Sequence, residues 1–515
     1  MGRRIRWLGL VLVICFALVV VQLANIQFKK ASALAHSPDN PVNRAPDYDN
    51  QRGRIFAADG TLLAQSVRVA PPGSARYQFE RQYPTGALFS HIVGVCNQAV
   101  PTIGCVSGTE GYYSQALSLH KQSPQNLSQL LSPPPARTED LWLTVDPKLQ
   151  QDAIDALNGL PGANKDGAIV MIRPSDGSIV AMASTPGFDP SPLASPDAKT
   201  AIQWYSLYNQ PDAEGFKPIY PMATYSTIAP GSTAKVITTA AIYNLDPALA
   251  TYNFPVAPCL TNIPDTDKQI CNDADTAAAA GPCGGTIVQM LPESCDPGYA
   301  KLGLLLGGDT LAQQAQLFGF NSRPPLDLGP NDPTHGFITQ ASQYPTAQQL
   351  ANGSEPGVPG QAYSAFGQQD VATTALQNAM VAAAIANHGT IMVPHLMWKV
   401  TNSQGKVIET YQPTVWKQAT SSQAASQVIP LMQGVATKGT AAGVFSASLN
   451  VAAKTGTAQV GSPTVTSVAD WMIAFAPANN PQIAIAVVVP YQPLDTQGAT
   501  VAGPIANEML LDALG

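Results

Sequence analysis

A serine and a lysine three residues apart stand near the middle of the chain, in the segment 229–237, which reads APGSTAKVI. Pro230 and Gly231 break the backbone before Ser232, whereas the residues after Ser232 are compatible with a helix. Serine is a favoured N-cap residue, so we expect Ser232 in the first turn of this helix. Lys235 then lies on the same face, one turn further along.

This pair of side chains could carry out nucleophilic catalysis. A serine hydroxyl is a weak nucleophile until a base takes its proton. A lysine in apolar surroundings beside other cations loses its own proton more readily, so Lys235 could be the base for Ser232. The N–H groups at the helix N-terminus could polarise a carbonyl. Alone, the Ser-x-x-Lys spacing is weak evidence, because a capped surface helix has the same pattern.

Two further stretches strengthen the catalytic interpretation. Ser294-Cys295-Asp296 and then Lys454-Thr455-Gly456-Thr457 follow in the chain. The order Ser-x-x-Lys, Ser-x-Asn-like, Lys-Thr-Gly is typical of penicillin-binding proteins and serine β-lactamases. The competing interpretation is purely structural: Ser232 as a helix cap, Ser294 as a polar residue near a turn, and Lys454 as a charge on an edge strand.

The elements around these motifs predict an α+β domain. Asp146-Pro147 indicates the start of a helix that ends near Leu157, because Asp is a good N-cap and Pro fits the first helical position. Helices are also expected at 374–388 and from Pro504 onward. Strands are expected at 141–145, 167–172, 178–183, 451–460, 471–476 and 482–489. Strands near both ends with helices between them predict one sheet built from distant parts of the chain. Residues 251–285 and 345–361 read as irregular insertions.

Chain length, net charge and histidine content limit the classes of function that this protein could have. The chain has 515 residues, enough for two or three domains, and a net charge of −7. An acidic chain argues against a nucleic-acid partner, which would require a basic surface. The six histidines are scattered and form no metal-ligand pair, so we expect neither a metal nor a cofactor.

The N-terminus predicts a membrane anchor. Arg3, Arg4 and Arg6 precede the apolar stretch 8–21. We expect a cytoplasmic tail at 1–6, a transmembrane signal-anchor at 7–26, a stalk at 27–50 and an extracytoplasmic catalytic domain. The alternative is a cleaved signal peptide, since Ala33-Leu34-Ala35 resembles a cleavage site.

The chain has seven cysteines, and an exported body would permit disulfides. Cys15 lies in the apolar N-terminal stretch. We expect the pairs Cys96–Cys105, Cys259–Cys271 and Cys283–Cys295, although the sequence does not fix the connectivity. The alternative for Cys295 is a small buried apolar residue between two site residues.

A smaller domain is expected before the catalytic one. Asp59-Gly60 between apolar runs predicts a hairpin. The proline run at 132–135 indicates a boundary between an N-terminal pedestal domain at 51–135 and a larger domain at 136–515.

Nearly the whole chain resembles a class B penicillin-binding protein, and within that class the penicillin-binding protein A type of actinobacteria. The resemblance rests on further segments: Arg52-Gly53-Arg54-Ile55 with Asp59-Gly60 and Leu63-Ala64, Gly108-Thr109-Glu110, Leu143-Thr144-Val145-Asp146, Phe188-Asp189-Pro190, and the KTGTAQ stretch at 454–459. It implies a β-lactamase-like transpeptidase domain with a five-stranded antiparallel sheet flanked by helices, beside a mixed α/β pedestal. No segment resembles a glycosyltransferase domain.

The resemblance also implies an activity: D,D-transpeptidation of peptidoglycan stem peptides, with acylation by β-lactams. Ser232 would attack the penultimate D-Ala carbonyl, Lys235 would be its base, and Ser294 would relay a proton to the leaving amine. The backbone N–H groups of Ser232 and Thr457 would form the oxyanion hole. The substrate carboxylate would be held by Lys454, Thr455 and Thr457. Gly456 would leave room for substrate to lie along its strand.

One position departs from the family pattern. Asp296 stands where most members have Asn, and an ionised Asp accepts hydrogen bonds but donates none. It could pair with Lys235. The alternatives to a transpeptidase are a catalytically weak scaffold of a wall-synthesis complex and a β-lactamase-like hydrolase. The resemblance implies a lipid II polymerase as a membrane partner.

Overall fold

The computed structural model describes residues 7, 10, 12–19, 22, 51–69, 79–97, 100, 102–119, 137–161, 165–272, 281–332, 336–460 and 467–515. Within this part of the chain no helix combines the length and apolar character needed to cross a membrane. The expected tail, the expected stalk, part of the expected anchor and the proline run at 132–135 lie outside the described residues. Gln51–Arg68 and Glu80–Gly515 form one compact unit, which contains the five-stranded sheet, all of the six-stranded sheet except its residue Phe79, and all three motifs.

A five-stranded antiparallel sheet lies at the centre of the catalytic part, as the sequence predicted. Its order is β17-β18-β19-β5-β6, so strands from both ends of the domain meet in one sheet. The strands are β5 (Gly167–Ile172), β6 (Ile179–Thr185), β17 (Ala452–Val460), β18 (Ser467–Ala476) and β19 (Ile483–Pro493). Nearly every residue of these strands is buried, which explains why they read as continuous apolar runs rather than as alternating patterns.

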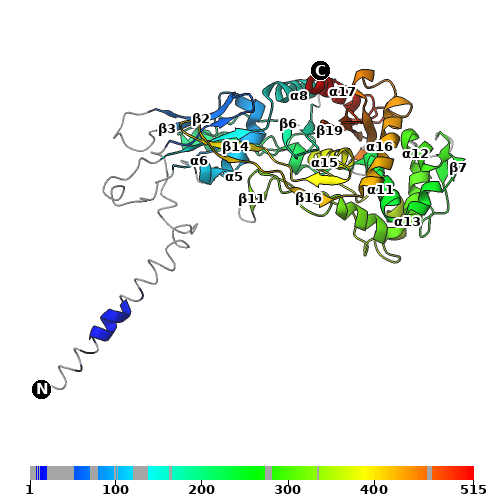
Figure 1. Cartoon of the computed structure of the whole chain (residues 1–515), viewed down its shortest axis with the longest axis horizontal. Helices are drawn as coiled ribbons and strands as arrows, with labels where there is room; N and C mark the ends of the chain where they lie inside the picture. The colour runs from blue at the N-terminus through cyan, green and yellow to red at the C-terminus, as the bar shows by residue number, and fades with distance from the viewer. Residues whose placement is uncertain are drawn as a thin grey trace. The chain divides into compact units, whose positions relative to one another are not determined.

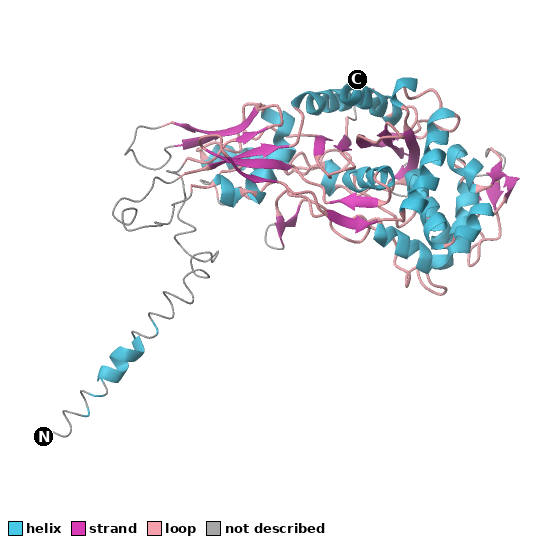
Figure 2. Cartoon of the chain, in the orientation of Figure 1, coloured by secondary structure: helices cyan, strands magenta, loops and turns pink. Residues whose placement is uncertain are grey.

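Helices cover both faces of this sheet. On one side α8 (Pro147–Asn158) and α17 (Ala502–Leu514) pack together and against β6, β18 and β19. On the other side α15 (Ala375–Ala386) packs against β5, β18 and β19 and is buried along its whole length (Figures 1 and 2). The helix α8 begins as predicted, since the Asp146 side chain accepts hydrogen bonds from the N–H groups of Lys148 and Leu149.

A helical lobe lies beside the β17 edge. It contains η3 (Gly231–Ala234), α11 (Lys235–Leu245), α12 (Ile287–Glu293), α13 (Asp296–Leu317), α14 (Gly357–Ser364) and α16 (Ser422–Thr437). The insertion at 251–285, which the sequence predicted to be irregular, carries two small strand pairs: β7 (Phe254–Ala257) with β10 (Cys283–Gly285), and β8 (Cys259–Leu260) with β9 (Ile270–Cys271). The label β7 marks this insertion at the far end of the lobe in Figure 1.

A second sheet, of six strands, has the order β15-β14-β4-β1-β2-β3. The strands are β1 (Ile55–Phe56), β2 (Leu62–Arg68), β3 (Phe79–Gln82), β4 (Glu139–Leu143), β14 (Met397–Asn402) and β15 (Val407–Thr410). The expected hairpin at Asp59-Gly60 is present, because β1 pairs antiparallel with β2 across it. The sheet crosses the domain boundary that we expected at residue 135, since β4, β14 and β15 come from the catalytic part of the chain.

Four further elements lie between β3 and β4 in the chain: η2 (Gly86–Phe89), α4 (Ser90–Val93), α5 (Gly108–Tyr112) and α6 (Ser114–Leu117). Elsewhere lie α9 (Ala198–Tyr208), α10 (Met222–Tyr225), η4 (Pro247–Thr251), β11 (Asn331–Asp332), β12 (Gly336–Phe337), β13 (Thr390–Met392), β16 (Val415–Gln418) and η5 (Ala447–Leu449).

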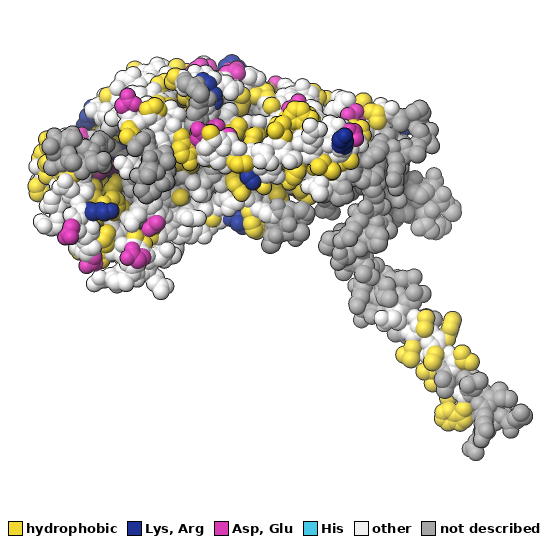
Figure 3. Space-filling model, turned by 180° about the vertical axis from the view of Figure 1, so that it is seen from behind, with side chains coloured by type: hydrophobic (Ala, Val, Ile, Leu, Met, Phe, Trp, Pro, Cys, Tyr) yellow, Lys and Arg dark blue, Asp and Glu magenta, His cyan; other side chains and the backbone are white. Residues whose placement is uncertain are grey.

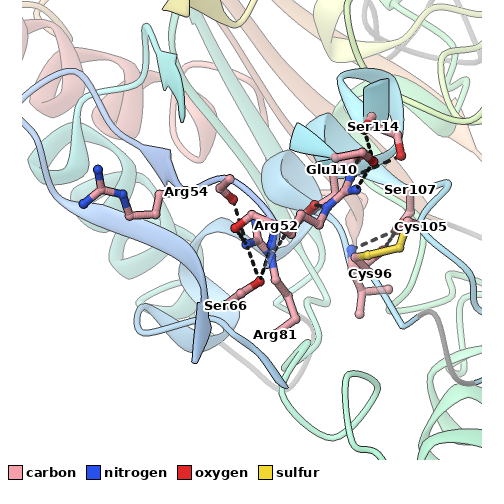
Figure 4. A network of polar contacts seen from close by, with 12 residues as sticks. Arg52, Arg54, Ser66, Arg81, Cys96, Cys105, Ser107, Glu110 and Ser114 are labelled. Atoms are coloured by element: carbon pink, nitrogen blue, oxygen red, sulfur yellow. Dashed lines mark hydrogen bonds and ion pairs between the residues drawn. A yellow bond between two sulfur atoms is a disulfide. The ribbon is translucent and has the colours of Figure 1, made fainter. Parts of the chain in front are cut away.

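A buried ion network joins the two N-terminal segments that carry the family resemblance (Figure 4). The Glu110 carboxylate accepts from Arg52 Nε at 2.6 Å and from Arg81 Nε at 2.5 Å, and its side chain is fully buried. Gly53 is required beside Arg52, because an added Cβ would lie 1.8 Å from the Glu139 carbonyl oxygen. The Arg-Gly and Gly-Thr-Glu segments are therefore two halves of one structural junction.

The three expected disulfides are all present: Cys96–Cys105, Cys259–Cys271 and Cys283–Cys295. Cys295 is thus a disulfide partner rather than a free buried thiol. Charged side chains are sparse among neutral and apolar ones on the face shown in Figure 3, which fits the 12% of charged residues in the chain.

Candidate active site

The candidate nucleophile lies in a tight turn at the start of a buried helix. Ser232 is half-buried within the 3₁₀ turn η3, which continues directly into α11. The expectation that Ser232 lies in the first turn is confirmed, but Ser232 is not the N-cap residue: Pro230 occupies the N-cap of η3, Ala234 that of α11, and neither helix has a side-chain capping hydrogen bond. Among the described residues, none makes a hydrogen bond with the Ser232 hydroxyl. The hydroxyl is therefore not committed to holding the backbone and is available to react.

Neighbouring side chains hold this turn in place. Trp471 Nε1 on β18 donates to the Ala229 carbonyl at 2.9 Å. Asn378 on α15 donates to Thr233 Oγ1 at 3.1 Å, and Thr233 Oγ1 donates to the Pro230 carbonyl at 2.9 Å. The residues on both sides of Ser232 are therefore fixed by buried hydrogen bonds.

Two glycines allow the turn to lie against strand β17. A Cβ added to Gly231, whose φ is +50°, would come within 2.6 Å of the Thr457 carbonyl oxygen. A Cβ added to Gly456 would come within 2.7 Å of the Pro230 carbonyl oxygen and 2.8 Å of Thr233 Cγ2. Gly456 therefore allows η3 and β17 to come into contact on the face toward which a side chain would point. The expectation that Gly456 also leaves room for substrate along its strand stays a prediction.

The second motif meets the lysine of the first. Lys235 is fully buried, and its Nζ donates to Asp296 Oδ1 at 2.5 Å, to Ser294 Oγ at 3.1 Å and to the Ser294 carbonyl at 2.5 Å. The ring of Tyr299 lies 5.4 Å from the same Nζ. The pairing of Asp296 with Lys235 that the sequence suggested is present as an ion pair.

The third motif, on β17, contacts Ser294. Lys454 is fully buried, and its Nζ donates to Ser294 Oγ at 2.8 Å. The Ser294 oxygen therefore accepts from two ammonium groups, which occupies both of its lone pairs and leaves its own proton free to be donated elsewhere. The structure thus brings together Lys235, Ser294, Asp296 and Lys454, which are far apart in the sequence.

The remaining residues of the third motif point to other neighbours. Thr455 Oγ1 lies 2.6 Å from Thr440 Oγ1 and 3.4 Å from Lys454 Nζ. The hydroxyl oxygen of Thr457, which is half-buried, lies 3.5 Å from Asp470 Oδ1 and accepts from the Gly498 N–H at 3.2 Å.

Sequence reasoning missed Asp470, which stands directly opposite Thr457 on β18. Burial raises the pKa of Asp470 to about 6, although hydrogen bonds from Thr496 and Thr457 lower it in part. An acidic residue inside the apolar run VADWMIAF indicates a buried carboxyl group that has polar partners, because charged side chains are buried only where such partners exist.

Asn272 was missed as well, and only the tertiary structure identifies it. Its Oδ1 accepts the backbone N–H of Asp296 at 3.0 Å from a separate segment of the chain. Nothing in the local sequence around Asn272 indicates that contact.

Comparisons with known proteins agree with this geometry. Residues 167–511 match the penicillin binding protein transpeptidase domain, and residues 52–123 match the penicillin binding protein A dimerisation domain. The chain is 33% identical to the peptidoglycan D,D-transpeptidase PbpA of Mycolicibacterium smegmatis over 517 residues, covering 98% of each chain. It is 31% identical to PbpA of Mycobacterium tuberculosis, covering 97% of this chain and 96% of the relative.

Solved structures give the same result. The ceftriaxone acyl-enzyme complex of penicillin-binding protein A from M. tuberculosis superposes with a TM-score of 0.77 at 29% identity, covering 91% of this chain and 99% of that one. The two sheets, the convergence of three separated motifs and the matches over almost the whole length lead to one conclusion. The chain belongs to the penicillin-binding protein transpeptidase family, in its class B, with a dimerisation domain of the penicillin-binding protein A type.

Proposed function

We propose that this chain is a peptidoglycan D,D-transpeptidase that cross-links stem peptides through a serine acyl-enzyme and is acylated by β-lactams. The observation that carries the proposal is the Ser294 hydroxyl, which accepts hydrogen bonds from both Lys235 and Lys454 and so joins one residue of each of the three motifs. The names of the mycobacterial relatives and the acyl-enzyme complex of the related structure support it.

In the acylation step, Ser232 Oγ attacks the carbonyl of the penultimate D-Ala and forms a C–O bond. Lys235 in its amine form takes the hydroxyl proton. The peptide C–N bond then breaks, and Ser294 passes a proton to the departing amine of the terminal D-Ala. Because Ser294 Oγ contacts both lysines, a proton that it donates outward can be replaced from either ammonium.

In the transfer step, the amine of a second stem peptide attacks the ester carbonyl, the bond to Ser232 Oγ breaks, and the proton returns to the serine. The terminal carboxylate of the substrate would be held near Lys454, Thr455 and Thr457, since an ammonium and two hydroxyls suit an anion. The N–H groups of Ser232 and Thr457 would stabilise the oxyanion.

Labelling with a fluorescent penicillin tests the proposal. The protein should form a stable covalent adduct, Ser232→Ala should form none, and Thr233→Ser, one residue away, should still react. Mass spectrometry of a reaction with pentapeptide-bearing glycan should then show loss of D-Ala and a cross-linked dimer. A wild-type protein that folds but is never labelled would contradict the proposal.

The same assay separates two other functions. Rapid loss of the label would favour a β-lactamase-like hydrolase over a transpeptidase. A stable adduct without any cross-linked product would favour a catalytically weak scaffold of a wall-synthesis complex.

We also propose that residues 7–26 form a membrane anchor with a cytoplasmic N-terminus, and that a lipid II polymerase is the partner in the membrane. The support is the arginine-flanked apolar run at 8–21 and the family resemblance. Retention of Met1 on the membrane-bound protein, and co-purification with a polytopic polymerase, would support these proposals. A mature N-terminus near His36 would contradict the anchor.

A further inference from the structure

The middle residue of the Ser294-Cys295-Asp296 motif is covalently bonded to a strand of the neighbouring insertion. Cys295 is fully buried and forms a disulfide with Cys283 on β10 of the insertion. Its two neighbours in the chain are the residues that contact Lys235. The disulfide therefore fixes the backbone between two groups of the candidate active site.

A second tie from the same insertion holds the other end of the motif. Cys295 is the N-cap of α13, and its side chain makes no capping hydrogen bond. The first turn of a helix leaves backbone N–H groups without intrahelical partners. Asn272 Oδ1 supplies the acceptor for the Asp296 N–H at 3.0 Å. Asn272 directly follows Cys271, which is bonded to Cys259 in the β8–β9 pair.

The conformation of Ser294 makes these ties important. Ser294 adopts the left-handed region, with φ +59° and ψ +38°, at the end of α12. This region is unfavourable for a residue with a Cβ, so it persists only where the surroundings enforce it. In this conformation the Ser294 carbonyl and hydroxyl both face Lys235 Nζ. A relaxation of Ser294 toward ordinary backbone angles would move both oxygens away from the lysine.

From these contacts we infer that Cys283, Cys295 and Asn272 are positioning residues for acylation: the insertion at 251–285 holds Ser294 and Asp296 against Lys235 by one disulfide and one side-chain cap. The inference rests on the proposed function. The three residues act through Ser294 and Asp296 and do not themselves touch the reacting atoms.

Saturation kinetics of acylation by a fluorescent penicillin test the disulfide. The full chain carrying Cys283→Ser and Cys295→Ser should lose about tenfold or more in the maximal acylation rate constant, because small misplacements of catalytic groups are costly. The half-saturating penicillin concentration should change little, since the residues expected to hold the carboxylate lie on β17. The matched control is Cys96→Ser with Cys105→Ser, which opens a disulfide of similar loop length near the second sheet and should leave the rate constant unchanged.

The Asn272 variants test the cap without altering any disulfide. Asn272→Leu removes the acceptor and should slow acylation, whereas Asn272→Asp keeps an oxygen for the Asp296 N–H and should restore most of the rate. A helix N-terminus accommodates the added negative charge. Thermal midpoints measured on the same samples separate positioning from stability, because a purely structural role would lower the midpoint and leave the rate constant per folded molecule unchanged.

The outcomes are distinct. A wild-type rate constant in the folded Cys283→Ser/Cys295→Ser protein, or equal rates for Asn272→Leu and Asn272→Asp, would overturn the inference. If the cysteine variant does not fold, the Asn272 pair decides alone. Failure of the unaltered protein to react with penicillin would instead contradict the proposed function.

Discussion

Replacing Asp296 by Asn tests how the ion pair controls the base. Asp296 Oδ1 lies 2.5 Å from Lys235 Nζ, and the two side chains are 16% and 0% exposed. A neighbouring anion stabilises the ammonium form of lysine, whereas catalysis requires the free amine. Asparagine has nearly the same shape and keeps an oxygen for Lys235, so the change removes charge and little else.

The distance between Asp296 and Lys235 sets the size of the electrostatic effect. At an effective dielectric constant of about 20, unit charges about 4 Å apart attract by about 4 kcal/mol. The neutral amide retains a hydrogen bond of about 1 kcal/mol, and the partial exposure of Asp296 lowers the attraction further. About 1–3 kcal/mol of electrostatic stabilisation of the charged pair is therefore lost on substitution.

The assay is the second-order rate constant of acylation by a fluorescent penicillin, measured by stopped flow from about pH 5 to about pH 9. The acidic limb of the profile for Asp296→Asn should move to lower pH, because the anion that favours the ammonium form is removed. The matched control is Asp309→Asn, which removes the same charge from an exposed position of α13 beyond the break at Gly307 and should leave the profile in place. Superimposable profiles for Asp296→Asn and the unaltered protein would refute the reasoning.

Three further predictions concern packing and buried charge. Gly456→Ala should slow acylation and destabilise the fold by about 1–3 kcal/mol, because the added Cβ would meet the nucleophile turn. The control Gly187→Ala should be tolerated, because no atom lies closer than 3.8 Å to the added Cβ. Equal melting curves and acylation rates for the two variants would contradict this prediction. Burial raises the pKa of Asp470 to about 6. The folded state therefore binds the carboxyl proton more tightly than the unfolded state does, and the stability of the fold decreases as pH rises from about 4 to about 6. The free energy of unfolding of Asp470→Asn, measured in urea, should therefore rise by about 1–2 kcal/mol relative to that of the unaltered protein between about pH 4 and about pH 7. A difference between the two unfolding free energies that does not change with pH would contradict this prediction. Glu110→Gln should cost about 3–5 kcal/mol at neutral pH, because Arg52 and Arg81 lose their buried counter-ion. Burial tends to raise the pKa of Glu110, but the two arginines lower the pKa overall. The stabilisation is therefore lost as pH falls below about 4, and the unfolding free energies of the two proteins should converge in acid. A difference in unfolding free energy that does not change with pH would contradict this prediction.

Much of the fold was accessible from local patterns. The start of α8 at Asp146-Pro147, the β5–β6 hairpin and the strands of the C-terminal sheet arise from capping, turn and hydrophobic signals that act over a few residues. The sheet built from both ends of the domain was predictable from the order of those elements. The six-stranded sheet was not predictable in the same way, because β14 joins β4 across more than 250 positions, and short strands carry no record of their partners.

The sequence by itself determined which chemical groups are present and in what order: a serine with a lysine one turn on, a second serine, and a second lysine on a strand. Only the tertiary structure decided what each of them contacts. It placed the nucleophile turn against Gly456, placed Asp470 opposite Thr457, and fixed Ser294 between two ammonium groups. The physical reason is that motif spacing reflects local geometry, whereas hydrogen bonds and ion pairs between segments depend on packing that no single stretch of the chain encodes.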